Sequence, residues 1–459
     1  MAQAVGEYLE SKCASQAIRE ELEALETVPK DSKECNGKQW IRARTARRWL
    51  RKLGFSFSEV KKDVYVDGHE RPDVVEYRND FLQRWATLKK KFAIFAEDGT
   101  WQRPQIPEDE RPIILVTHDE SIFNANDGKR RLWIENGNQP LRPKGKGKGI
   151  MVSGYLTPGG ILRVPENISD SELLEDSEWP RQPNGQPIRE AMEYLEFGKD
   201  HYWTGDKMVD QAINVALPIF NRAFPGCTAL FAFDNAANHC SFAPDALIAT
   251  KMNLGPGGKQ PIMRDGWDEK LGVSQRMIFP ADYPDARLRG QPKGIKQVLL
   301  ERGLWRDQNS DGTKFRLSCP KGSGATGCDP EKMGNCCAVR LLQSQPDFQN
   351  QRGRLEEEIN RSGHLVIFYP KFHCELNFIE RFWCSAKRYA RDNCTYGLAG
   401  LRETVPKAIS SIPTATINRY YNRCERIIEA YRSGCKIGTQ EFKDRVYSSH
   451  RRVEDNSTW

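Results

Sequence analysis

The sequence lacks the long apolar stretches that membrane proteins and secreted precursors carry. No apolar run approaches the roughly 20 residues that are needed to span a bilayer. The first 25 residues are mixed and acidic, without the apolar core of a signal peptide. No internal repeat is visible, and no glycine-rich segment has the spacing of a nucleotide-binding P-loop. We therefore expect a cytosolic or nuclear protein that neither enters a membrane nor binds ATP.

The composition is that of a polar but globular protein. Of the 459 residues, 38% are hydrophobic and 29% are charged, and the length allows two or three domains. The thirteen cysteines are odd in number, and no secretory signal accompanies them. Reduced thiols, with one metal cluster among them, fit these facts better than a disulfide framework.

Positive charge is concentrated near the N-terminus. Between residues 38 and 62 there are nine Lys or Arg and a single acid, Glu59, which is the electrostatic pattern of a phosphate-binding surface. Residues 44–54 have a helical period, with apolar side chains along one stripe. We predict the second helix of a helix-turn-helix here, the alternative being a solvated basic helix without a ligand. The expected DNA contacts are Arg44, Arg47, Arg48, Arg51 and Lys52.

A change of pattern after this region marks a domain boundary. A helical pattern over 73–95 is followed by a proline-rich linker, so we expect an all-α DNA-binding region at 1–96. Alternating strand and helix patterns then fill 112–411, and residues 412–459 form a helical tail. The chain is therefore predicted to hold an α/β domain between two helical parts.

Two strands of the predicted α/β domain lead to an aspartate. Residues 112–117 form a buried-strand pattern that leads to Asp119, and residues 229–233 form another that leads to Asp234. A later strand precedes a helix that carries Glu380. Between the two aspartates come two more strand patterns and a helical stretch, at 131–135, 149–156 and 207–224.

These three acids together predict a metal site. Ligands of an α/β sheet bind beyond the carboxyl ends of its strands, so the aspartates are expected to face one site. Three converging carboxylates repel one another unless divalent cations neutralise them, and oxygen-only ligands favour Mg²⁺ or Mn²⁺. Two such ions about 4 Å apart can bind both reacting oxygens of a phosphodiester. Taken singly, the aspartates are explained equally well as turn formers, and Glu380 as a solvated helix residue.

The residues around the acids resemble the three catalytic blocks of mariner-like DDE transposases and DDE superfamily endonucleases. The blocks are Thr117-His118-Asp119-Glu120-Ser121, Phe233-Asp234-Asn235 and Cys374-Glu375-Leu376-Asn377-Phe378-Ile379-Glu380-Arg381-Phe382-Trp383. The resemblance implies that Asp119, Asp234 and Glu380 are the catalytic residues and metal ligands, with Glu375 as the second choice for the third ligand. Phe378 departs from the family, which usually has proline at that position.

The resemblance also implies a fold and an activity. The fold is an RNase H-like core, a mixed sheet flanked by helices, which binds two Mg²⁺ or Mn²⁺ ions. The activity is that of a nuclear transposase, which cuts double-stranded DNA at transposon ends and joins the freed 3′-hydroxyl to target DNA. Such an enzyme is expected to work as a homodimer or a larger synaptic complex.

Two other functions remain open from the sequence. Mariner-like enzymes usually carry two helix-turn-helix units, and only one is evident here. A domesticated or truncated DNA-binding protein without catalytic activity is therefore the main alternative. A nuclease of RNA–DNA hybrids is the second, which the basic N-terminal region disfavours.

A long segment separates the second and third blocks. From Asp234 to Glu380 there are 380 − 234 = 146 positions, where mariner-like enzymes have only a few tens, so we expect an insertion at about 250–360. Four cysteines of this segment lie within 19 residues: Cys319, Cys328, Cys336 and Cys337. They predict either a structural Zn²⁺ or ordinary buried cysteines, because no Cys-x-x-Cys pair is present and adjacent cysteines bind one ion poorly.

A run of alternating lysine and glycine precedes the strand predicted at 149–156. It contains Lys144, Lys146 and Lys148. Glycine lets a backbone approach phosphate closely, and lysine supplies the charge. The run therefore predicts either a flexible hairpin that contacts DNA or a solvated loop.

Overall fold

The computed structural model describes residues 48, 68–129, 141–197, 203–236, 239, 241–309, 312, 314–319 and 336–447. The chain divides into two compact units, Met1–Asp67 and Gly68–Trp459. In the first unit Arg48 is described, and it is helical and exposed. The rest of the predicted helix-turn-helix lies outside the described residues, as does the strand predicted at 131–135. This also holds for the expected DNA contacts Arg44, Arg47, Arg51 and Lys52.

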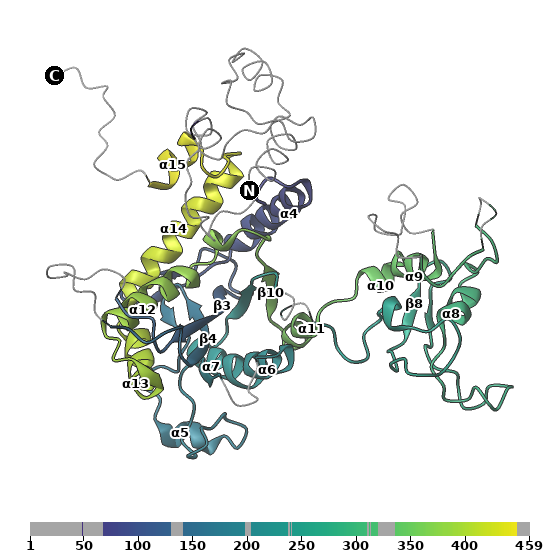
Figure 1. Cartoon of the computed structure of the whole chain (residues 1–459), viewed down its shortest axis with the longest axis horizontal. Helices are drawn as coiled ribbons and strands as arrows, with labels where there is room; N and C mark the ends of the chain where they lie inside the picture. The colour runs from purple at the N-terminus through teal and green to yellow at the C-terminus, as the bar shows by residue number, and fades with distance from the viewer. Residues whose placement is uncertain are drawn as a thin grey trace, which may run out of the picture. The chain divides into compact units, whose positions relative to one another are not determined.

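A mixed β-sheet forms the centre of the second unit (Figure 1). Its strands are β3 (Ile113–Asn124), β4 (Gly149–Thr157), β5 (Gly160–Ile161), β6 (Met192–Glu196), β7 (Thr228–Phe233) and β10 (Leu365–Phe368). The order is β10-β7-β3-β4-β5, and β6 also pairs with β4. Strands β10, β7 and β3 are parallel, whereas β4 is antiparallel to β3, β5 and β6. The mixed sheet that the sequence predicts is therefore present.

Helices cover both faces of this sheet, so its inner strands are apolar on both sides. One face carries α4 (Pro72–Lys89), α12 (Ile379–Asp392), α13 (Gly397–Ser410), α14 (Thr414–Arg432) and α15 (Gln440–Tyr447). The other carries α5 (Asp170–Glu175), α6 (Gly205–Gln211), the π-helix η1 (Ala212–Ala216), α7 (Leu217–Ala223) and α11 (Arg354–Arg361). Alternate residues of β3 contribute to the two cores, Ile113 and Leu115 to the first and Ile114 and Val116 to the second.

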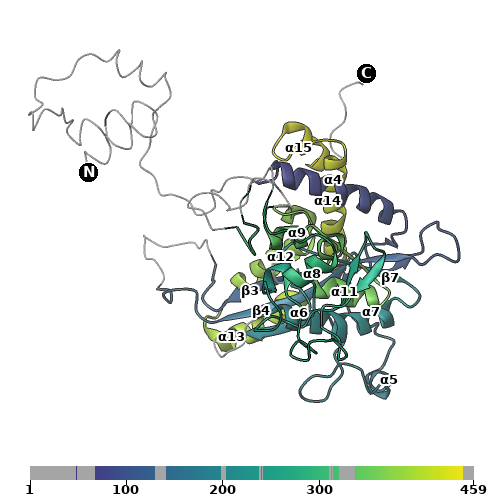
Figure 2. The ribbon, with the colours of Figure 1, turned by 90° about the vertical axis from the view of Figure 1, so that its right-hand side faces the viewer.

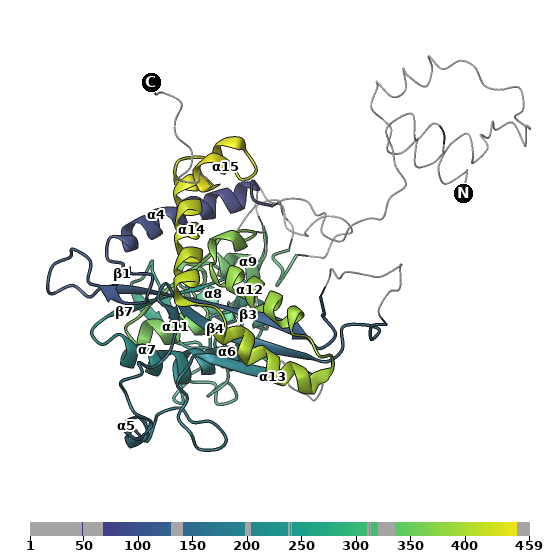
Figure 3. The same ribbon diagram turned by 90° about the vertical axis from the view of Figure 1, so that its left-hand side faces the viewer.

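The first face carries both the first helix of the second unit, α4, and its last described helices, α14 and α15. Helix α4 contributes Phe81, Leu82 and Trp85 to the same core as α12, and α14 contacts α4 (Figures 2 and 3). The short strands β1 (Ile94–Phe95) and β2 (Trp101–Gln102) pair with each other, and Phe95 and Trp101 pack against the core on the opposite face. The helices that precede and follow the α/β domain in sequence are thus packed on it.

The segment between β7 and α11 builds a core of its own. It contains η2 (Ala249–Lys251), β8 (Gly266–Asp268), β9 (Val273–Gln275), α8 (Ile295–Glu301), α9 (Ala338–Gln343) and α10 (Pro346–Gln349). Thirteen buried side chains between Leu247 and Phe348 form its cluster, and none belongs to the two cores of the sheet. Across the described part of the chain, no helix is both long and apolar enough to cross a membrane.

Candidate active site

Asp119 lies within β3, and Asp234 directly follows β7, the neighbouring parallel strand. The register pairs Thr117 with Ala232. Asp119 comes two positions after Thr117, and Asp234 two positions after Ala232. Side chains two positions apart along a strand point to the same face of a sheet. Ala232 belongs to the core beneath α12, so Asp119 faces the side of the sheet that α12 covers. Asp234 stands just past the end of β7, and its charge acts on both Asp119 and Glu380.

Helix α12 brings the third acid to this face. Glu380 lies in its first turn, and the buried stripe of Phe382, Trp383 and Ala386 packs the helix against the sheet. These positions follow the helical period, which leaves Glu380 half-buried at the start of the helix. The predicted triad is therefore contributed by two adjacent strands and a helix that lies on them.

A buried asparagine fixes the start of α12 to β3. Asn377, which is 3% exposed, accepts a hydrogen bond from Thr117 Oγ1 at 2.6 Å through its Oδ1. Its Nδ2 donates to the backbone oxygen of His118 at 3.3 Å. These two residues immediately precede Asp119, so the third sequence block is bonded to the strand that carries the first acid.

The three carboxylates repel one another. Burial raises the pKa of Asp119 well above its ordinary value, and the negative charges of Glu380 and Asp234 add to the shift. Burial and the charge of Asp234 also raise the pKa of Glu380, which Lys387 only partly offsets. Oxygens of the three groups do not all lie within 4.8 Å of one another.

His239 contacts the second aspartate. Its Nδ1 forms an ion pair with the carboxylate of Asp234 and lies 3.0 Å from the backbone oxygen of Asp234. Its Nε2 lies 3.7 Å from Glu120, which accepts a hydrogen bond of 2.5 Å from Trp203 Nε1. Burial lowers the pKa of His239, but the interactions with the carboxylates of Asp234 and Glu120 outweigh it and raise this pKa to about 10. The protonated ring in turn lowers the pKa of Asp234, against the effect of burial.

His118 lies beside this pair on the α6 face. The Ser153 hydroxyl donates to Gln211 Oε1 at 2.6 Å, so it accepts at 2.8 Å from His118 Nε2. Burial lowers the pKa of His118 to about 4, and the ring is neutral at pH 7. Ligand atoms of His118, Glu120 and His239 lie within 4.8 Å of one another. A protonated His239, however, has no lone pair to offer an ion.

Glu375, the second choice for the third ligand, belongs to a different network. Its carboxylate accepts hydrogen bonds from His373 Nδ1 at 2.7 Å and Tyr431 Oη at 2.8 Å, and His69 Nε2 lies 3.5 Å away. Burial opposes its ionisation, but the bonds from His373 and His69 lower the pKa of Glu375 to about 2. Its charge is therefore already compensated by neighbouring side chains, unlike that of Glu380.

The predicted lysine contacts lie on an exposed loop. Lys144, Lys146 and Lys148 are all exposed, just before β4. The backbone oxygens of Lys146 and Lys148 accept hydrogen bonds from Asn126 and Ala125, which follow β3. The loop thus continues the β3–β4 pair, and its three ammonium groups are accessible to a phosphate backbone.

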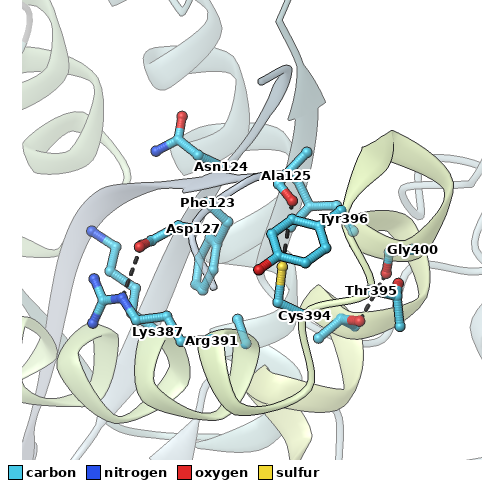
Figure 4. A pocket seen from close by; sticks show the side chains of 13 residues that line it. Phe123, Asn124, Ala125, Asp127, Lys387, Arg391, Cys394, Thr395, Tyr396 and Gly400 are labelled. Atoms are coloured by element: carbon cyan, nitrogen blue, oxygen red, sulfur yellow. Dashed lines mark hydrogen bonds and ion pairs between the residues drawn. The ribbon is translucent and has the colours of Figure 1, made fainter. Parts of the chain in front are cut away.

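A small pocket lies where β3 ends beside α12 and α13 (Figure 4). Arg391 of this pocket forms an ion pair with Asp127 at 2.8 Å, and Cys394 Sγ donates to the backbone oxygen of Ala125 at 3.5 Å. None of the three candidate acids is among the described residues that line it. The pocket is therefore separate from the acidic site, and Arg391 is engaged by the protein itself.

Three of the four clustered cysteines are described. The thiols of Cys319, Cys336 and Cys337 lie within 4.8 Å of one another. Cys328 lies outside the described residues. The structure thus brings together three of the residues that the sequence predicts as zinc ligands.

Sequence reasoning missed His239 as a part of the site. The chain has only seven histidines, and three of them lie within seven positions of a candidate acid: His118, His239 and His373. That clustering was the available signal. It does not reveal which histidine contacts which acid, because His239 turns back to Asp234 whereas His373 binds Glu375.

No family model matches the chain, and no curated protein matches it. Among solved structures, the chain is similar to a Mos1 transposase paired-end complex with the left transposon end. The identity is 10% and the TM-score 0.35, over 94% of this chain and 78% of that chain. It is also similar to a Mos1 strand transfer complex, with 12% identity and a TM-score of 0.35 over 99% and 79% of the two chains. These TM-scores are too low to carry a conclusion on fold or function.

Proposed function

We propose that this chain is a metal-dependent DNA endonuclease of the DDE transposase type, in which Asp119, Asp234 and Glu380 bind the metal ions. The observation that carries the proposal is the register of β3 and β7. It places Asp119 on the face over which α12 holds Glu380, and it brings Asp234 to the end of the neighbouring strand. The electrostatic coupling of the three groups supports their assignment to one site.

The sheet topology supports an RNase H-like core. Strands β3, β4 and β5 form an antiparallel series, and β7 and β10 extend the sheet from β3 in parallel. The two aspartates belong to the first and fourth of these strands, and the glutamate to the helix after the fifth. This is the arrangement that the resemblance to DDE transposases implies.

The donor atoms of the triad fit Mg²⁺ or Mn²⁺. All three side chains offer carboxylate oxygens, which hard divalent cations prefer. When bound, two such ions would activate the attacking oxygen and stabilise the leaving oxygen of a phosphodiester. Burial and neighbouring negative charges raise the pKa values of Asp119 and Glu380, and the positive charge of a bound cation would lower both. His239 holds the carboxylate of Asp234 in position.

Glu380 rather than Glu375 is the third ligand in this proposal. Glu375 is occupied by His373 and Tyr431 and has a pKa of about 2. Coordinating an ion would break both hydrogen bonds. Glu380 is only partly compensated, by the charge of Lys387, and it interacts with the charges of Asp119 and Asp234.

Double-stranded DNA is the proposed substrate. The exposed lysines of the 144–148 loop lie beside β3 and can contact phosphate, and the basic N-terminal region is proposed to bind the transposon ends. A nuclear location and a homodimer or larger synaptic complex belong to the same proposal. The competing function is that of a DNA-binding protein that has lost the reaction.

Plasmid nicking tests the proposal. Full-length protein is incubated with supercoiled plasmid and Mg²⁺ or Mn²⁺, and Asp119→Asn and Asp234→Asn are compared with Asp392→Asn. Asp392 is an exposed acid at the other end of α12 and is the matched control. We expect metal-dependent nicking that both triad variants abolish and the control retains. Full activity in Asp119→Asn and Asp234→Asn would contradict the site.

Mn²⁺ calorimetry separates the two functions if no nicking is seen. Metal binding that Asp234→Asn abolishes would keep the enzyme assignment and direct the search to the correct DNA ends. Absence of Mn²⁺ binding by the unaltered chain would favour the inactive DNA-binding protein.

A further inference from the structure

The cysteine cluster between β7 and α11 takes no part in the proposed reaction. Its three thiols come from two segments, Cys319 from one and Cys336 and Cys337 from the other. Cys337 is 2% exposed and the other two are partly buried.

The backbone holds the two segments side by side. The N–H of Ala338 donates to the backbone oxygen of Arg316 at 2.9 Å, and that of Val339 to the backbone oxygen of Leu317 at 3.0 Å. The two donor residues come directly after Cys337 in sequence, and the two acceptor residues come shortly before Cys319. The thiols are therefore brought together by main-chain bonds rather than by the choice of side-chain rotamers alone.

We propose that Cys319, Cys336 and Cys337 bind one Zn²⁺ ion as thiolates in a structural site. Sulfur ligands select zinc over the hard cations that the carboxylate triad favours. Zn–S bonds of about 2.3 Å in a tetrahedral site set sulfur atoms roughly 3.8 Å apart. The observed separations, all within 4.8 Å, require only small side-chain movements to reach that geometry. Each thiol releases its proton on binding.

The structure also removes the objection that the sequence raises. Two consecutive cysteines bind one ion poorly when their side chains diverge. Here the sulfur atoms of Cys336 and Cys337 both lie within 4.8 Å of Cys319 Sγ and of each other. Cys328 lies outside the described residues; in the proposed site a water molecule fills the fourth position beside the three thiolates.

The surrounding fold explains why an ion would be useful there. The cluster from Leu247 to Phe348 is built from helices of seven, six and four residues and from two strands of three. Small cores made of short elements are commonly stabilised by a metal or by disulfides. The cysteines flank this core, since Phe315 and Ala338 are both buried in it. The ion would link the segment that ends at Cys319 to the segment that begins at Cys336.

Zinc content is the direct test, and it does not depend on the proposed nuclease activity. Full-length protein, purified without chelators or a histidine tag, is analysed by elemental mass spectrometry. We expect about one zinc per chain, in line with a single structural site. Cys319→Ser and Cys336→Ser should each lose most of it. Cys384→Ser, which removes an exposed free cysteine of α12, should retain it.

Cobalt replacement tests the site in the unaltered chain, so its result does not depend on whether the cysteine variants fold. Substituting Co²⁺ into the unaltered chain should produce near-ultraviolet thiolate-to-cobalt charge-transfer absorption. Its absence, or zinc that persists in the Cys319→Ser/Cys336→Ser double variant, would overturn the proposal. A chain that neither contains zinc nor takes it up when Zn²⁺ is added would overturn it equally.

Discussion

Two glutamates lie close to the start of α12, and they differ in how their charge is compensated. Glu375, in the short 3₁₀ helix η4 (Cys374–Leu376), is surrounded by His373, His69 and Tyr431, and its pKa is about 2. Five residues later, Glu380 faces other acids, and its pKa is raised. The carboxylate of Glu375 is fully paired within the fold, whereas that of Glu380 has only the partial counter-charge of Lys387 against its acidic neighbours.

This difference indicates which acid serves the fold and which serves a ligand. A buried carboxylate with three partners stabilises the packing of the chain around it. Carboxylates held together against their repulsion reduce stability until a cation neutralises them. The closeness of Glu375 and Glu380 in sequence therefore does not indicate a shared role. Whether neighbouring side chains compensate the charge of each glutamate is the better indicator.

The largest effect is expected from neutralising each glutamate in turn and measuring nicking. Glu380→Gln should reduce metal-dependent cleavage at least about 1,000-fold, equivalent to about 4 kcal/mol of transition-state stabilisation. Glu375→Gln should leave the rate per folded molecule nearly unchanged. Loss of cleavage in Glu375→Gln with full cleavage in Glu380→Gln would make Glu375 the third ligand and contradict the roles given to the two glutamates.

A smaller effect, on stability, is expected at Glu375. Its folded pKa of about 2 lies below the ordinary 4.5, so its stabilisation is full above pH 4.5 and declines as the pH falls toward 2. Glu375→Gln should thus lower the free energy of unfolding by about 2–3 kcal/mol at pH 7. Urea titrations at pH 7 and pH 3.5 measure this, and the difference should shrink at the lower pH. Glu380→Gln, measured in EDTA, should not destabilise the chain, because it removes repulsion.

The smallest effect concerns the histidine that binds Asp234. His239→Gln should weaken Mn²⁺ binding about 10-fold in calorimetry, because a partner that orients a ligand is lost. His364→Gln is the control, since His364 is a buried histidine that accepts from the backbone N–H of Ala229. Tighter binding in His239→Gln would show instead that the charge of His239 competes with the ion.

The sequence predicts those parts of the site that depend on local pattern. Buried-strand runs before Asp119 and Asp234 coincide with β3 and β7, because both faces of these strands are covered. The apolar stripe of the helix after Glu380 is likewise visible in the spacing of Phe382, Trp383 and Ala386. The spacing of apolar residues reveals which side chains are buried, and this burial determines where the two strands and the helix form.

Contacts between distant residues could not be read from the same patterns. His69 and Glu375 meet across 306 positions, and nothing in their local sequence pairs them. Strand β6 was missed because it is only partly buried, so it shows no strong apolar alternation. The sequence also predicts poor metal binding by the adjacent Cys336 and Cys337, because the direction of neighbouring side chains depends on a backbone conformation that sequence does not reveal.

The bridge that Asn377 makes to β3 has a consequence for the timing of catalysis. Because Thr117 and the backbone of His118 hold the residue that precedes α12, the helix cannot slide along the strand without breaking buried hydrogen bonds. Glu380 is thus held near the aspartates before any ion or DNA arrives. An enzyme built in this way is preorganised, and its affinity for metal need not be reduced by the ordering of a mobile ligand.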